Sequence, residues 1–299
     1  METKNDTRLT RNGAAALALG TAALALAACA TAAEQADWPD PASAAASGWT
    51  QDRFDAWVES RAGAPATVGE SGDPVYWYSL GTLRAFPGGD MLYTLEGYDI
   101  SNARRVSPTK AEQYSRKIYI YRDAETGAVV DEVNGEPVEP IAYPYQFITY
   151  ELKENADGEA YLETFVEQGV EPRVQEIGPG TDITVRQFGE LQLYTAPLFL
   201  DFPLPDGSQY QTFENYDFII PEEDDDGPAI ITFMRYGPLP GFAKTDQAEM
   251  GAMHMQTWRI EDYEDVPASL RDYVEAEAPL WAAPPADLAD IRRLQGRTP

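Results

Sequence analysis

The chain contains one histidine, His254, and so one side chain whose ordinary pKa lies near neutral pH. If the protein is an enzyme, His254 is the natural general acid or base, with the phenol of Tyr236 and the carboxylate of Glu96 as predicted partners. Tyrosine and arginine groups would then stabilise an oxyanion, as in a lyase, hydratase or isomerase without a cofactor. The alternative is a histidine that is hydrogen-bonded to a neighbouring strand or loop and takes no part in catalysis.

The side chains available exclude several kinds of catalytic site. One imidazole cannot build a site of two or three histidines, and the single cysteine, Cys29, falls outside the folded region predicted below. The sequence has no Gly-x-Ser-x-Gly elbow, no Gly-x-Gly-x-x-Gly fingerprint and no Gly-Lys-Thr phosphate loop. We therefore predict no metal site and no cofactor.

A concentration of positive charge is the second candidate site. Five basic residues fall between positions 104 and 117: Arg104, Arg105, Lys110, Arg116 and Lys117. Arginine forks bind carboxylate, sulfate or phosphate groups through paired hydrogen bonds, so this segment predicts a site for an anionic ligand group. The alternative is that these arginines pair with the protein's own carboxylates. The full set of predicted ligand-binding residues comprises Arg104, Arg105, Arg116 and Arg235 for charge and Tyr98, Tyr119 and Trp258 for aromatic walls.

Composition limits the possible partners. Asp and Glu number 50 against 22 Lys and Arg, and the formal net charge is −28. Nucleic acid and anionic lipid both require Lys and Arg to replace their counterions, so we predict no nucleic-acid partner. The acidic run 222–226 is interpreted as a solvated loop; cation binding is the alternative, but the spacing of a calcium hand is absent.

Alternating apolar and polar residues predict the elements that position these side chains. The clearest alternation is 114–122, and the turn 87–90 separates two segments that suit a hairpin. Strands are predicted at 75–83, 91–98, 114–122, 129–130, 143–152, 159–168, 181–187, 191–200, 210–220, 229–236 and 252–260, and helices at 53–61, 268–278 and 287–294. The fold class is therefore mainly β: an antiparallel meander of about ten strands that forms a barrel or sandwich, with a short N-terminal helix and C-terminal helices.

The N-terminal residues are similar to the leader of a bacterial lipoprotein. Three basic residues precede an apolar run, 14–28, that is too short to span a bilayer of about 30 Å. Ala27 and Ala28 before Cys29 resemble a lipobox, which implies cleavage before Cys29 and acylation of its sulfur. Ala30 resembles the version that is sorted to the outer membrane, so we expect a lipid-anchored protein that faces the periplasm. Secretory cleavage at Ala28-Cys29-Ala30, which would leave a soluble periplasmic protein, is the alternative.

These signals predict three segments. Residues 1–28 are a lipoprotein signal peptide, and 29–48, rich in Ala, Ser, Pro and acids, are a flexible stalk. Residues 49–299 are a single β-rich domain with a helical tail. The expected partners are the membrane, through acyl chains on Cys29, and a small-molecule ligand.

Two segments resemble a bacterial family of secreted and membrane-associated proteins, domain-of-unknown-function family 1838. The first is 119–131, Tyr-Ile-Tyr-Arg-Asp-Ala-Glu-Thr-Gly-Ala-Val-Val-Asp, and the second is Met234–Gly241 followed by His254, Trp258 and the stretch 266–284. The family's Trp-x-Asn-Pro after the aspartate is replaced here by Glu132-Val133-Asn134-Gly135. The resemblance covers most of 70–285 and implies the fold and the address, without a reaction.

The residues thus support three functional hypotheses. The first is a binding module that holds a small anionic or amphiphilic molecule in a cavity lined by aromatic residues and arginine. The second is the enzyme built around His254. The third is an envelope protein that works through protein contacts, which a large exposed apolar patch would indicate.

Overall fold

A computed structural model describes residues 48–170, 173–177, 183–188, 191–203, 207–221 and 229–297. Residues 42–299 form one compact unit. The predicted leader, Cys29, nearly all of the predicted stalk and the acidic run 222–226 lie outside the described residues. No helix among those described is both long and apolar enough to cross a membrane.

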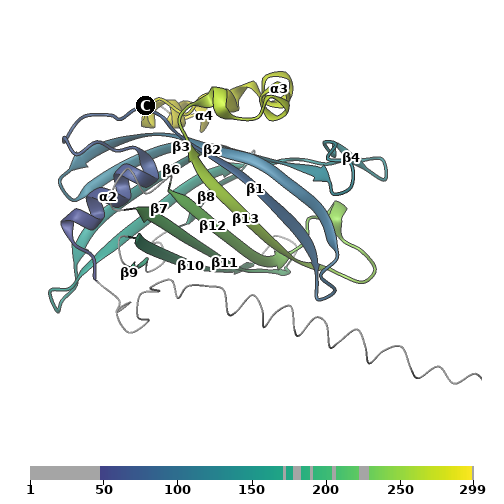
Figure 1. Ribbon diagram of the computed structural model, residues 1–299, viewed down its shortest axis with the longest axis horizontal. Coiled ribbons are helices and arrows are strands. Elements are labelled where there is room, and N and C mark those ends of the chain that lie inside the picture. The colour runs from purple at the N-terminus through teal and green to yellow at the C-terminus, as the bar shows by residue number, and fades with distance from the viewer. Residues whose placement is uncertain are drawn as a thin grey trace, which may run out of the picture. The chain divides into compact units, whose positions relative to one another are not determined.

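The described chain is dominated by one antiparallel sheet of 11 strands. Its members are β1 (Val75–Phe86), β2 (Met91–Ser107), β3 (Lys110–Asp123), β6 (Ile141–Glu154), β7 (Ala160–Val170), β8 (Arg173–Ile177), β9 (Thr184–Phe188), β10 (Leu191–Pro203), β11 (Gln209–Pro221), β12 (Ile230–Pro238) and β13 (Met250–Ile260). The sheet curls into a half-barrel (Figure 1). The predicted fold class, a mainly β meander with helices at both ends, is confirmed.

Strand order follows chain order except at one place. The order is β8-β7-β6-β3-β2-β1-β13-β12-β11-β10-β9, so the last strand lies beside the first. The chain therefore moves outward from β1 to one end of the sheet, starts again at the other end and returns. This topology places residues from the two halves of the sequence on one continuous concave surface.

Helix α2 (Gln51–Ala62) fills one end of the concave face, as Figure 1 shows at the left. The hydroxyl of Thr50 caps its first turn, and Gly63, with φ of 72°, ends it. Phe54, Trp57 and Val58 belong to a buried cluster that also contains side chains from nine strands, among them Trp77, Tyr150, Tyr194 and Phe218. The helix is thus an internal plug and contributes much of the core.

The convex face is covered in part by the C-terminal segment. Helix α3 (Ala268–Glu277) buries Leu270 and Val274 on Ile100 and Ile118 of the sheet. Helix α4 (Leu288–Leu294) places Ile291 against a second set of aromatic residues, Tyr114, Tyr145 and Phe147. Three short 3-10 helices complete the described helical structure: η3 (Gly241–Ala243), η4 (Tyr263–Asp265) and η5 (Pro279–Ala282).

The structure differs from the predicted elements in four places. Strand β2 continues to Ser107 and so includes the first part of the basic segment. Strand β8 and the two-residue pair β4 (Glu132–Val133) and β5 (Glu136–Pro137) were not predicted, because short strands show too little alternation. The predicted strand 129–130 is only a bridge from Val129 to Arg122, since Asp123 and Thr126 form a tight turn before it.

Candidate functional site

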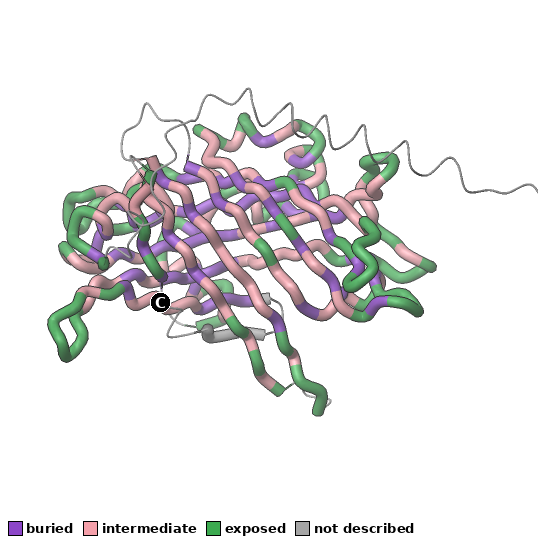
Figure 2. The backbone as a smooth tube through the Cα atoms, turned by 60° about the horizontal axis from the view of Figure 1, so that its bottom comes forward, coloured by how far each residue is buried: buried purple, intermediate pink, exposed green. Residues whose placement is uncertain are grey.

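Strand periodicity divides the predicted site residues between the two faces of the sheet. Neighbouring residues of a strand point to opposite faces, and Figure 2 shows the resulting alternation of burial along the strands. Arg105, Tyr119 and Arg235 face the concave interior. The other seven candidates face the convex side: Glu96, Tyr98, Arg104, Arg116, Tyr236, His254 and Trp258.

The three residues predicted for catalysis have separate surroundings. His254 is exposed on β13, opposite Thr82 and Met234. The ring of Tyr236 packs edge-on against Phe86, with centroids 4.7 Å apart. Glu96 accepts hydrogen bonds from Tyr78 Oη at 2.7 Å and Arg122 Nε at 2.6 Å. The structure therefore does not bring these three together as a catalytic set.

Four of the five basic residues between 104 and 117 are held by the protein itself. Arg104 lies 3.0 Å from Glu112, and Lys110 lies 3.3 Å from Glu151. Arg105 is buried and binds the carbonyls of Pro65 and Pro108. Arg116 binds the carbonyls of Pro144 and Ala283 on the convex side, where burial lowers its pKa. The basic residues of this segment therefore do not form one site, because neighbouring residues of a strand point to opposite faces of the sheet.

The two convex aromatic candidates pack the sheet surface. Tyr98 is buried and donates a hydrogen bond to the carbonyl of Trp281 at 2.7 Å, which helps to hold the C-terminal segment. Trp258 is half-buried and stacks on Tyr78, with centroids 6.5 Å apart. Both rings therefore have structural contacts on the convex face of the sheet.

The remaining candidates belong to a polar band that crosses the concave interior. We call it the interior belt, and it comprises Asp99, Lys117, Tyr119, Tyr143, Glu214, Tyr216 and Arg235. Asp99, Lys117 and Tyr143 are opposite one another on three successive strands, β2, β3 and β6. Glu214 and Tyr216 come from β11, and Arg235 from β12. Sequence analysis selected Tyr119 and Arg235 as ligand-binding residues and placed Lys117 in the basic segment, whereas Asp99 and Tyr216 are separated by 117 positions in the sequence.

Electrostatic coupling across the interior shows that the two halves of the belt face each other. Burial raises the pKa of Tyr143, and Glu214 on the far side raises it further, while Arg235 lowers it. Burial also raises the pKa of Tyr216 well above its usual value, with further increases from Glu214 and from the phenol of Tyr119. These phenols therefore stay protonated at neutral pH and can both donate and accept hydrogen bonds.

Lys117 is distinctive among the cations of the belt. Arg235 lies 3.6 Å from Glu214, so its charge has a carboxylate partner. Lys117 Nζ lies 4.6 Å from the centre of the Tyr143 ring, and within the described ranges it forms no ion pair. A half-buried ammonium group over an aromatic face retains its donors for a further acceptor.

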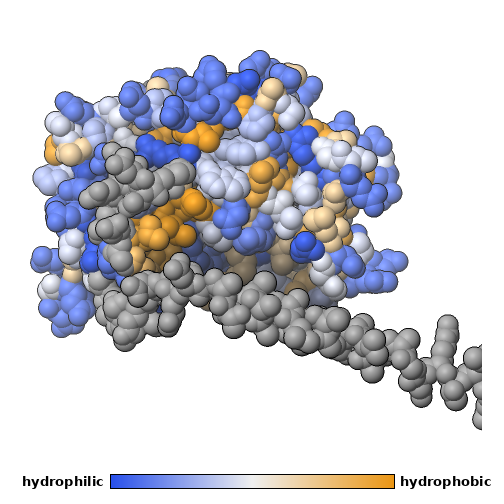
Figure 3. Space-filling model, viewed as in Figure 1, coloured by the Kyte–Doolittle hydropathy of each residue, from blue (hydrophilic) through white to orange (hydrophobic). Residues whose placement is uncertain are grey.

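Apolar side chains border the belt on both sides. The core around α2 lies at one end, and a second cluster, which includes Leu83, Leu95, Met253 and Met255, lies at the other. Figure 3 shows one side of the molecule with apolar and hydrophilic side chains side by side around a hollowed region. The arrangement suits a ligand that has both a polar group and an apolar part.

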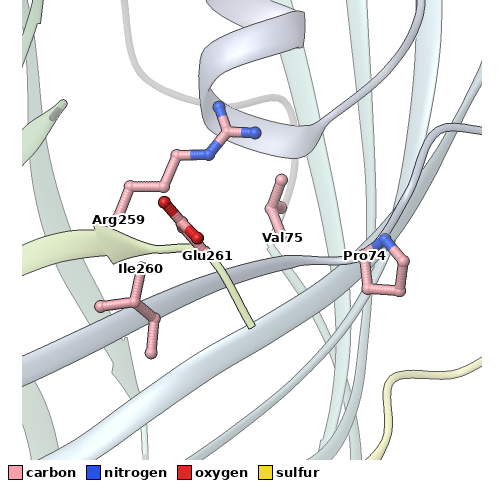
Figure 4. A pocket seen from close by; sticks show the side chains of 5 residues that line it. All are labelled: Pro74, Val75, Arg259, Ile260 and Glu261. Carbon is pink, nitrogen blue, oxygen red and sulfur yellow. The ribbon is translucent and has the colours of Figure 1, made fainter. Parts of the chain in front are cut away.

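A separate cavity of about 350 Å³ lies at the end of β1 and β13. Figure 4 shows its lining, Pro74, Val75, Arg259, Ile260 and Glu261, with the Arg259 side chain directed at the helix. Arg259 donates to the carbonyl of Ser60 at 3.1 Å. This cation is thus engaged at the C-terminal end of α2, where a positive charge stabilises the helix.

No protein-family model, curated protein or solved structure matches the chain. The resemblance to domain-of-unknown-function family 1838 therefore stays a prediction.

Proposed function

We propose that this protein is a binding module and that the concave interior holds a small organic molecule with an anionic group. The observation that carries the proposal is the position of Lys117, an ammonium group without a carboxylate partner in the described chain, beside the ring of Tyr143. Around it, three phenols supply hydrogen-bonding groups. The ligand's apolar part would contact side chains such as Phe233 and Met255.

Because the protein as a whole is negatively charged, a cation in its interior provides a selective site for an anion. A net charge of −28 repels anions from most of the surface. Inside the half-barrel, Arg61 and Arg235 are paired with Asp99 and Glu214, whereas Lys117 has no carboxylate partner among the described residues. An anion is therefore attracted at this one point of the belt, where partial burial strengthens the interaction.

An anionic aromatic dye, 8-anilinonaphthalene-1-sulfonate, provides the first test. We expect its fluorescence to rise on binding to the native protein, and Lys117→Met to weaken binding by about tenfold, because a partly buried charge contact is lost. Lys110→Met is the matched control, since Lys110 lies on the same strand and is paired with Glu151 at 3.3 Å. Equal dye binding by the two variants would contradict the proposal.

We propose in addition that the domain is tethered to the outer membrane through acyl chains on Cys29 and faces the periplasm. The support is the lipobox-like sequence Leu26–Cys29 behind an apolar run. A tether of about 20 residues would leave the domain free to meet small molecules in the periplasm.

A further inference from the structure

Asp99 of the interior belt forms an ion pair with Arg61, and one polar atom of each side chain has no hydrogen-bond partner among the described residues. Arg61, near the end of α2, places Nη2 at 3.2 Å from Asp99 Oδ2. Two further polar atoms of the pair, Arg61 Nη1 and Asp99 Oδ1, are buried and have no hydrogen-bond partner among the described residues. Buried polar groups are nearly always paired, so one unused donor and one unused acceptor on the two partners of a single ion pair require an explanation.

Two nearby residues also carry buried polar atoms without hydrogen-bond partners in the described part of the chain. Ser101 Oγ and Gln113 Nε2 are also buried without a partner in the described chain. The amide oxygen of Gln113 accepts from Tyr150 Oη at 2.7 Å, and Tyr150 is electrostatically coupled to both Arg61 and Asp99. The unused groups therefore gather in one region of the concave face, under α2.

This region borders the proposed binding site. Asp99 is directly opposite Lys117 in the pairing of β2 with β3, and such partners have Cα atoms about 5 Å apart. The side chains of Arg61 and Asp99 are 12% and 11% exposed, so the pair is largely but not completely buried. Tyr119 is coupled to the same pair and to Lys117.

We infer that the ligand carries a hydroxyl group that binds between Arg61 Nη1 and Asp99 Oδ1, within a few bonds of an anionic group at Lys117. The inferred class is therefore a hydroxylated organic acid, such as a sugar acid. A hydroxyl group has both the acceptor and the donor that these atoms need. Arg61 and Asp99 neutralise each other, so their position favours a neutral group, and the charge of the ligand belongs at Lys117. This inference rests on the proposed function.

Three small probe molecules distinguish the contribution of the anionic group from that of the hydroxyl groups. D-Glucuronate has a carboxylate and ring hydroxyls, cyclohexanecarboxylate has the carboxylate on a bare ring, and D-glucose has hydroxyls without the charge. By titration calorimetry we expect glucuronate to bind about tenfold or more tightly than either of the others. Equal binding of glucuronate and cyclohexanecarboxylate, or tighter binding of cyclohexanecarboxylate, would overturn the inference and would mean that the two atoms bind water only.

The double variant Arg61→Met with Asp99→Leu tests the assignment of the atoms. It replaces the ion pair with apolar side chains of similar size, an exchange that folded proteins often tolerate. We expect the ratio of its affinities for glucuronate and cyclohexanecarboxylate to fall to about one. A preserved preference in a folded double variant would overturn the inference. If thermal unfolding shows that the variant does not fold, the comparison of the three probes on the native protein decides alone.

The binding measurements also show whether the proposed function itself is wrong. If neither acid binds and the sulfonate dye does not bind, the interior is not an anion site and the proposed function is wrong. If both acids bind equally and Lys117→Met abolishes both, the proposed function stands and only the hydroxyl position fails.

Discussion

The ring of Tyr119 on β3 lies against Gly97, its partner residue on β2, so closely that a Cβ atom at Gly97 would collide with it. The same Cβ atom would meet the carbonyl oxygen of Ile118, which belongs to the sheet and cannot move aside. The absence of a side chain at position 97 is therefore what lets the phenol of Tyr119 lie within the interior belt.

Gly97→Ala should consequently destabilise the domain by about 1–3 kcal/mol, through overpacking, and displace Tyr119. Urea unfolding followed by tryptophan fluorescence measures the loss. Gly241→Ala is the control, because nothing lies within 4 Å of a Cβ atom there; its effect should stay within about 0.5 kcal/mol. An unchanged urea midpoint for Gly97→Ala would show that the strands can separate locally at no cost.

Two adjacent arginines should differ sharply in their contribution to stability. Arg105 is buried, lies 2.9 Å from Asp55 of α2 and has its guanidinium 5.1 Å from the centre of the Phe54 ring. Arg105→Met leaves buried carbonyls unpaired and loosens α2, so we expect a loss of about 2–4 kcal/mol. Arg104→Met removes an exposed ion pair and should cost less than about 1 kcal/mol. Thermal unfolding of both variants compares them; similar melting temperatures would contradict the assigned role of Arg105.

Alkaline pH should destabilise the domain through its buried tyrosines. Burial raises the pKa of Tyr121 and of Tyr150 to about 12, whereas an unfolded tyrosine ionises near pH 10. Because the folded state favours the neutral phenol, this contribution to stability is complete below about pH 10 and is lost as the pH rises through about 12. Urea unfolding between pH 8 and 11.5 should show the decline, with a shallower slope for Tyr150→Phe. A flat profile would contradict the burial of these phenols.

The predicted tether at Cys29 can be tested independently of ligand binding. In a bacterial host, the chain should incorporate a fatty-acid label and fractionate with the outer membrane. Cys29→Ser should abolish both properties, because the sulfur that carries the diacylglyceryl group is lost. Ordinary secretory cleavage predicts instead a soluble periplasmic protein that is unlabelled in either form.

Local sequence patterns were sufficient to predict most of the elements. The alternation through 114–122 lies inside β3, the turn at 87–90 joins β1 to β2, and the apolar spacing of 53–61 lies within α2. These features depend on residues a few positions apart, which is the range over which strand and helix periodicity acts. The two C-terminal helices were predictable for the same reason.

The candidate site was only partly predictable. Five basic residues close together in sequence suggested one site, but Arg104 and Arg105 point to opposite faces, and Arg116 is engaged by the C-terminal segment. Lys117 could have been distinguished by its spacing of two from Tyr119, which places both on one face of β3. Nothing local predicted that Tyr143 and Glu214 would lie near them.

The sequence by itself determined most of the strands, the α-helices and which neighbouring side chains share a face. Only the tertiary structure decided which of them meet, because the curl of the sheet brings β3 and β6 opposite β11 and β12, and strand order places the last strand beside the first. The same curvature accommodates α2, and with it Arg61 reaches Asp99 from 38 positions away. The proposed site is therefore a product of sheet curvature acting on residues that no short stretch of sequence contains.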